Sequence, residues 1–158
     1  MGYHEVAQIC LNGHVITDRF NQNTEFRKDF CDKCGSSTIH QCPNCNNNIQ
    51  GDYIVEGYFS IGHEPHLPNY CLHCGHPFPW TESRLDAAKD LVMATEELEE
   101  KELLVQSLPD LVADTPRTSL AASRWKKALI KVGGYTAEAF REILIDVLSE
   151  SAKKILFP

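Results

Sequence analysis

Long apolar stretches are missing from this sequence, in which the longest unbroken run of apolar residues is the four-residue segment 91–94. A membrane-spanning helix needs about 18 or more such residues, so we expect no such helix and no membrane partner. The first ten residues, MGYHEVAQIC, also lack the apolar core of about 7–15 residues that a secretory signal requires. These absences lead us to expect a cytoplasmic protein.

Positive charge is also scarce, because 15 Lys and Arg residues stand against 22 Asp and Glu residues and give a formal net charge of −7. Proteins that bind phosphate backbones broadly carry a clustered basic surface. The charge therefore disfavours nucleic acid as a partner, and we expect a protein partner instead.

Cysteine and histidine are absent from residues 81–158, although the chain has seven of each. An odd number of cysteines fits a disulfide framework poorly, and in a reducing cytosol closely spaced cysteines more often bind metal. Residues 81–158 instead contain long stretches of Ala, Leu, Glu and Lys at helical spacing. The sequence therefore predicts two domains, a metal-stabilised one over residues 1–80 and a helical one over residues 81–158.

Four short motifs in the first domain have the spacing of metal ligands, three of them C-x-x-C and one C-x-x-x-H. They are Cys10 with His14, Cys31 with Cys34, Cys42 with Cys45, and Cys71 with Cys74. Two such turns supply the four corners of one zinc tetrahedron, so we expect two zinc ions per chain. Complete ligand sets leave no position for a reactive water, which predicts structural rather than catalytic zinc.

The residues that follow three of these motifs support the same interpretation. Gly35, Asn46 and Gly75 each come directly after a second cysteine, where a zinc knuckle commonly turns with positive φ. Sequential pairing of the four motifs predicts two zinc ribbons, each with a β-hairpin between its knuckles. We favour it because only seven residues separate Cys34 from Cys42, which leaves little room for a hairpin, but a cross-braced arrangement remains as the alternative.

The second domain is predicted to contain three or four helices. The first is expected from about residue 83 toward residue 106, and a short helix or turn follows over 108–112. Pro116 begins a third helix, which the Gly133-Gly134 pair ends, and Thr136 caps the last one. The fold class is therefore α+β, with small-β tandem zinc ribbons followed by a helical module.

Two further features are candidate binding elements. Arg117, Arg124, Lys127 and Lys131 lie in a segment without acidic residues and are the candidate contacts to a partner. The alternative is a solvated face that complements the acidic residues at 96–102. The segment His63-Glu64-Pro65-His66 has the wrong spacing for H-E-x-x-H, and we interpret it as a polar loop, with a binding feature as the alternative.

Several strings of the sequence resemble a family of uncharacterised bacterial double zinc-ribbon proteins. These strings are C-x-N-G-H-V-I-T, F-C-x-x-C-G-x-x-T-I-x-x-C-P-x-C and Y-C-x-x-C-G-x-P-x-P-W-T, with D-T-P-R-T and S-E-x-A-K-K in the helical part. The resemblance implies a bacterial, cytosolic, zinc-containing protein and no established activity. It also implies that the eight residues of the four motifs are zinc ligands.

The function that these observations predict is that of a non-enzymatic adaptor or regulatory protein, in which zinc fixes loops that contact another protein. No nucleophile with a neighbouring base stands out in the sequence, so an enzyme is not expected. A nucleic-acid-binding zinc ribbon is one alternative. A RING-like, cross-braced module for ubiquitin-like ligation is the other, and it requires the first and third motifs to share a metal.

Overall fold

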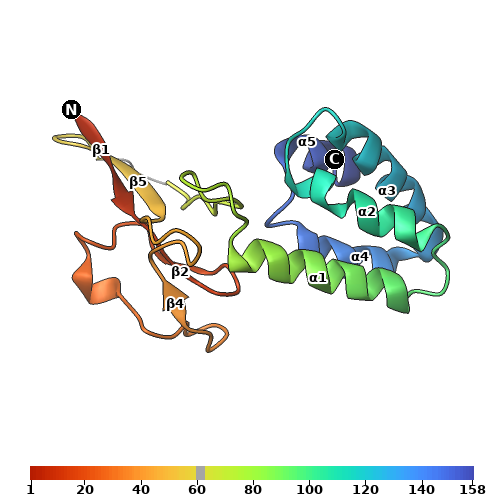
Figure 1. The fold of residues 1–158 in the computed structure, drawn as a ribbon, viewed down its shortest axis with the longest axis horizontal. Coiled ribbons are helices and arrows are strands. Elements are labelled where there is room, and N and C mark those ends of the chain that lie inside the picture. Colours follow the sequence, from red (N-terminus) through yellow and green to blue (C-terminus); the bar gives the residue numbers. More distant parts are fainter. Residues whose placement is uncertain (60–62) are drawn as a thin grey trace. The chain divides into compact units, whose positions relative to one another are not determined.

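The computed structural model describes residues 1–59 and 63–158. The chain divides into two compact units, Met1–Thr81 and Glu82–Pro158, which we describe one at a time (Figure 1). The division lies one residue beyond the boundary drawn from the cysteine and histidine distribution.

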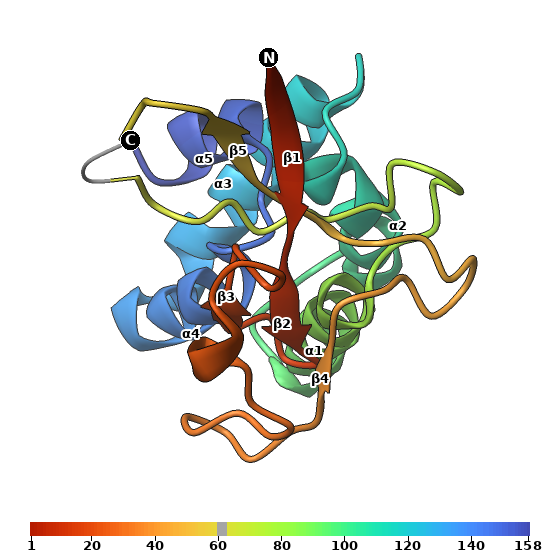
Figure 2. The same cartoon turned by 90° about the vertical axis from the view of Figure 1, so that its left-hand side faces the viewer.

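The N-terminal unit contains two small antiparallel sheets. Its elements are β1 (Gly2–Val6), β2 (Gln8–Cys10), β3 (Val15–Thr17), the 3-10 turn η1 (Thr24–Phe26), β4 (Thr38–Ile39) and β5 (Gln50–Val55). One sheet pairs β1 with β5, and the other places β2 between β3 and β4 (Figure 2). The first three knuckle motifs lie at the ends of these short strands or in the loops between them, and the fourth lies between β5 and α1.

The prediction of a β-hairpin between the two knuckles of each ribbon is wrong, because the strands in these segments pair with strands that come before the segments in the chain. The segment after β3 forms η1 instead of a returning strand, and β3 pairs backward with β2, where Ile9 lies opposite Val15. The predicted strand in the second ribbon is β5, but it pairs with β1, where Tyr3 lies opposite Ile54. Part of that inter-knuckle segment, residues 60–62, lies outside the described residues.

A small hydrophobic core holds the N-terminal unit together and includes two of the predicted metal ligands. Ile9 and Trp80 are fully buried, and Cys42 and Cys71 pack in the same cluster. The Trp80 indole N–H donates to the carbonyl oxygen of Pro68 at 2.8 Å, which satisfies the one polar group of this side chain. Because thiols form part of this core, a metal bound to them would stabilise the core itself.

The helical unit contains the helices that follow the knuckles, and the structure has five where three or four were expected. They are α1 (Pro79–Ala94), α2 (Lys101–Val112), α3 (Thr118–Val132), α4 (Gly134–Leu144) and α5 (Glu150–Leu156). The first turn of α1 belongs to the N-terminal unit. Helix α3 contacts α2, α4 and α5, so it is the central element of the unit (Figure 1).

Local interactions explain the additional helix ends. The hydroxyl of Thr95 donates to the carbonyl oxygen of Leu91 at 2.6 Å directly after α1, and Glu100 adopts a left-handed conformation with φ of 52° before α2. Side-chain bonding of this kind competes with helix continuation. Ser149 caps α5 by accepting a hydrogen bond from the Ala152 amide at 3.2 Å, which separates α5 from α4.

Trp125 of α3 is the centre of the helical core. Its side chain is fully buried, and its ring packs edge-on against Phe140 with centroids 5.3 Å apart. The indole N–H donates to the Ser107 hydroxyl at 2.9 Å, which ties α3 to α2. None of the helices in the described part of the chain has the length and hydropathy needed to cross a bilayer.

Candidate metal centres

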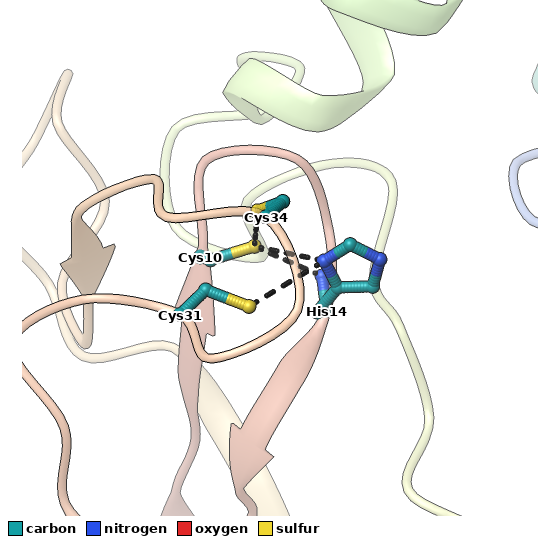
Figure 3. A group of neighbouring side chains, drawn as sticks. All are labelled: Cys10, His14, Cys31 and Cys34. Atoms are coloured by element: carbon teal, nitrogen blue, oxygen red, sulfur yellow. Dashed lines mark hydrogen bonds between the residues drawn. The ribbon is translucent and has the colours of Figure 1, made fainter.

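The first candidate metal centre brings together Cys10, His14, Cys31 and Cys34, whose ligand atoms all lie within 4.8 Å of one another. Figure 3 shows three sulfur atoms and the Nδ1 atom of His14 directed toward a common point. The Cys10 sulfur lies 3.7 Å from the Cys34 sulfur and 3.4 Å from His14 Nδ1, and the Cys31 sulfur lies 3.6 Å from the same nitrogen. The imidazole therefore presents Nδ1, not Nε2, to the centre.

The second candidate metal centre consists of Cys42, Cys45, Cys71 and Cys74. The sulfur atoms of Cys42 and Cys74 are 3.8 Å apart, and those of Cys45 and Cys71 are 3.6 Å apart. A regular tetrahedron with Zn–S bonds of about 2.3 Å has edges of about 3.8 Å, and an S–N edge is about 3.5 Å. Both centres match these dimensions. All seven cysteines are free thiols, so no disulfide competes for them.

The knuckle turns place the ligands as the sequence predicted. Gly35, Asn46 and Gly75 have φ values of 75°, 62° and 72°. In each turn the amide of this residue donates to the carbonyl oxygen of the first cysteine at 2.8–2.9 Å. The positive φ closes the loop so that the two thiols of a C-x-x-C motif point the same way. The prediction of these turn conformations is confirmed.

Burial differs among the ligands within each centre, in the same way in both. Cys10 and Cys31 are buried in the first centre, as are Cys42 and Cys71 in the second, whereas Cys34 and Cys74 are exposed. Burial raises the pKa of the Cys42 thiol to about 11 and raises the pKa of Cys10 as well. A bound divalent cation would offset this cost because it favours the thiolate.

Hydrogen-bond donors have the opposite effect on the other thiols. The Ser36 amide, followed by the Asn12 side chain, lowers the pKa of Cys34 to about 5. The Asn47 side chain lowers the pKa of Cys45 to about 6, and the Asn44 side chain lowers the pKa of Cys74. The asparagine amides donate to the sulfur atoms at 3.3–3.4 Å. Each centre therefore contains a thiolate at neutral pH that is ready to bind a metal ion.

Replacing Asn44 with alanine is expected to weaken zinc binding at the second centre by about tenfold. This is the lower end of the range of about 10–100-fold that is usual when a metal ligand loses a hydrogen-bond partner. The change removes the amide that lowers the pKa of Cys74, so that pKa rises and protons displace zinc at a higher pH than in wild type. A pH titration with a zinc-responsive dye measures the midpoint of release. Asn21→Ala, at an exposed asparagine away from both centres, is the control, and an Asn44→Ala midpoint equal to the control would contradict this role.

The pairing of the motifs is sequential, the first with the second and the third with the fourth. The cross-braced alternative is therefore wrong, and with it the RING-like hypothesis, because no metal centre in the described residues combines the first and third motifs. The short connection over residues 35–41 contains strand β4, which pairs with β2. This connection joins Cys34 of the first centre to Cys42 of the second.

The structure places the four candidate partner contacts close to acidic side chains. Lys131 lies 3.7 Å from a carboxylate oxygen of Glu99, and Arg117 lies 3.8 Å from one of Asp110. Arg124 and Lys127 line a groove together with Glu99 and Glu100. This arrangement agrees with the alternative of a face that complements the acidic segment. Their role as partner contacts stays a prediction.

One group of metal-ligating side chains was missed by the sequence analysis. Asp18, Asp52 and His63 bring a carboxylate oxygen or ring nitrogen within 4.8 Å of one another. They come from three separate segments with no local spacing to identify them, and the segment with His63 was interpreted as a polar loop, with an unspecified binding feature as the alternative.

Comparison with known proteins gives a family match that spans almost the whole chain. The matching family is described as an uncharacterized protein conserved in bacteria, and the match covers residues 3–156. No curated protein and no solved structure matches the chain.

Proposed function

The chain belongs to this bacterial family, DUF2321, and from that premise we propose that it is a zinc-stabilised, non-enzymatic adaptor protein. In this proposal the two candidate metal centres hold one zinc ion each. The N-terminal unit then presents a fixed surface to a protein partner.

The assignment of zinc follows from the chemistry of the donors and from their separations. Thiolate and imidazole ligands at the corners of a tetrahedron select zinc among the common divalent ions. The sulfur–sulfur separations of 3.6–3.8 Å correspond to such a tetrahedron. Four protein ligands fill each centre, so the proposed zinc has no open position for substrate or water and acts as a structural element.

The observation that carries the adaptor proposal is the exposure of large apolar side chains at the knuckles. Phe30 directly precedes Cys31 and is 67% exposed, and Leu72 lies between Cys71 and Cys74 and is 73% exposed. The unit gains no hydrophobic stabilisation from these two side chains, because they remain in water. We propose that these two side chains, each fixed on a knuckle, are the apolar anchors of a contact with another protein.

The charge of the unit indicates which kind of partner surface would fit. Residues 1–80 contain 4 Lys and Arg against 8 Asp and Glu, a net charge of −4. Two zinc ions with seven thiolates and one neutral imidazole add a further −3. We therefore propose a protein partner with an apolar recess bordered by basic residues. Nucleic acid fits this surface poorly, because the acidic field repels phosphate.

Site-specific photocrosslinking in a bacterial host tests the proposal. A photoreactive amino acid at position 72 is expected to give a covalent adduct with a protein, whereas the same group at Leu120, an exposed leucine of the helical unit, gives none. The adduct at position 72 should disappear in a Cys71→Ser background, because the knuckle then loses its metal. Equal adducts at both positions, or an adduct that persists without the knuckle, would refute the adaptor surface.

A further inference from the structure

We propose that Asp18, Asp52 and His63 form a third metal site, for an exchangeable divalent transition-metal ion, on the wall of a cavity in the N-terminal unit. This site is chemically different from the two thiolate centres. It contains two carboxylates and one imidazole, a donor set that suits ions such as Mn²⁺ or Fe²⁺. The proposal does not depend on the adaptor function.

The separations between the donor atoms support coordination more than direct hydrogen bonding. The Nε2 atom of His63 lies 3.5 Å from Asp18 Oδ2 and 3.4 Å from Asp52 Oδ1. Charge-assisted hydrogen bonds to carboxylates are shorter, at about 2.7–2.9 Å. Ligand atoms around one ion with bonds of about 2.1 Å lie about 3.0–3.5 Å apart. The imidazole therefore stands at coordination distance from both carboxylates.

The backbone holds the two aspartates side by side. Asp18 follows β3 directly and Asp52 lies in β5, and the Asp52 amide donates to the Asp18 carbonyl oxygen at 3.0 Å. The preceding residue has to be glycine for this approach, because a Cβ on Gly51 would overlap with that same carbonyl oxygen. The close backbone contact between Asp18 and Asp52 thus places the two carboxylates near each other.

Burial and charge distinguish this group from an ordinary surface cluster of acidic residues. The Asp52 side chain is only 5% exposed, and Arg19 donates two hydrogen bonds to its Oδ2 atom at 2.7 and 3.0 Å. That contact neutralises one charge and orients the carboxylate so that Oδ1 faces His63. One carboxylate oxygen of each aspartate therefore remains directed at the proposed ion.

A cavity next to the three side chains supports the metal site independently of the distances between their donor atoms. It has a volume of about 470 Å³, and its lining includes all three proposed ligands together with His4, His66 and Tyr53. Three protein ligands leave coordination positions that water or a small ligand in this cavity would fill. Both thiolate centres, by contrast, have complete sets of four protein ligands. The proposed site is therefore open to the cavity, and its ion exchanges readily.

Titration of the zinc-loaded full-length protein with Mn²⁺ tests the proposal, because thiolate centres prefer zinc and Mn²⁺ does not displace it. The electron paramagnetic resonance signal of free Mn²⁺ should fall until one ion is bound per chain. Bound Mn²⁺ should also broaden the NMR signals of His4, Tyr53 and His66, which line the cavity. In His63→Gln and Asp18→Asn, Mn²⁺ binding should be lost at concentrations that saturate wild type.

Glu64→Gln is the matched control, since it removes an exposed carboxylate next to His63 that is not a proposed ligand. This variant should bind Mn²⁺ as wild type does. Unchanged zinc content and dispersed NMR spectra show that all variants are folded. Failure of wild type to bind Mn²⁺, or equal binding by His63→Gln and Glu64→Gln, would overturn the third site and leave the zinc proposal untouched.

Discussion

Replacing Cys42 with serine is expected to unfold the N-terminal unit and leave the helical unit folded. Cys42 is a ligand of the second metal centre and is also 2% exposed within the hydrophobic core. Binding of a structural zinc contributes about 10–16 kcal/mol in small zinc domains, whereas a whole domain is stable by about 5–15 kcal/mol. The two figures are of the same order, so we expect that weakening the zinc by one ligand is enough to unfold a unit of this size.

Native mass spectrometry of reduced protein in metal-free buffer measures the zinc content, and NMR spectra report which residues stay folded. Wild type should retain two zinc ions, and Cys42→Ser at most one, with dispersed signals only from residues 82–158. His73→Ser changes an exposed residue in the other knuckle of the same centre, between Cys71 and Cys74, and serves as the control, which should retain both ions. A Cys42→Ser protein with two zinc ions and a fully dispersed spectrum would defeat the assignment of the second centre.

Replacing Trp125 with alanine is expected to destabilise the helical unit by about 3–5 kcal/mol, the usual cost of removing a large buried aromatic side chain. Trp125 is fully buried, packs edge-on against Phe140 and donates to Ser107. The substitution leaves a cavity in the core and removes the hydrogen bond that Trp125 donates to the Ser107 hydroxyl. The N-terminal unit, which has a separate core, should keep both zinc ions.

Urea denaturation followed by circular dichroism measures this loss, because the helical signal comes mainly from α2 to α5 and most of α1. Leu120→Ala is the control within the same helix, as Leu120 is 58% exposed and its truncation should change stability by about 0.5 kcal/mol or less. If the two variants unfold at the same urea concentration, Trp125 is not the centre of the core.

The parts of the structure that could be predicted from the sequence are those determined by neighbouring residues. A C-x-x-C motif contains its own geometry, because two ligands and the turn that orients them occupy five consecutive positions. Gly35, Asn46 and Gly75 therefore identified the positive φ values correctly. The sequential pairing followed from the same reasoning, since too few residues separate Cys34 from Cys42 for an independent hairpin.

The strand partners could not be predicted, because they depend on contacts between distant segments. β1 pairs with β5, and β2 with β4, across long stretches of chain. Three-residue strands such as β2 and β3 also contain too few residues to show an alternating pattern. The break between α1 and α2 depends on the Thr95 hydroxyl and on the backbone of Glu100, and the apolar periodicity contains no sign of either.

The third group of ligands shows the same limit at the level of a site. Asp18 and Asp52 are brought together by a backbone hydrogen bond between β5 and the residue that follows β3. The motif His63-Glu64-Pro65-His66 was correctly excluded as H-E-x-x-H, but its first histidine finds its ligand partners elsewhere in the chain. Spacing rules detect sites made of local pairs and miss sites assembled one residue at a time.

The unequal burial of the ligands has a consequence for how the proposed zinc ions would leave. In each centre the buried thiols belong to the interior of the unit, and one thiol, Cys34 or Cys74, faces solvent. An incoming chelator, acceptor protein or oxidant reaches the exposed corner first, so exchange proceeds through that corner while the buried thiols still hold the ion. The two centres would thus both begin to release metal at the equivalent corner, the last cysteine of each ligand set.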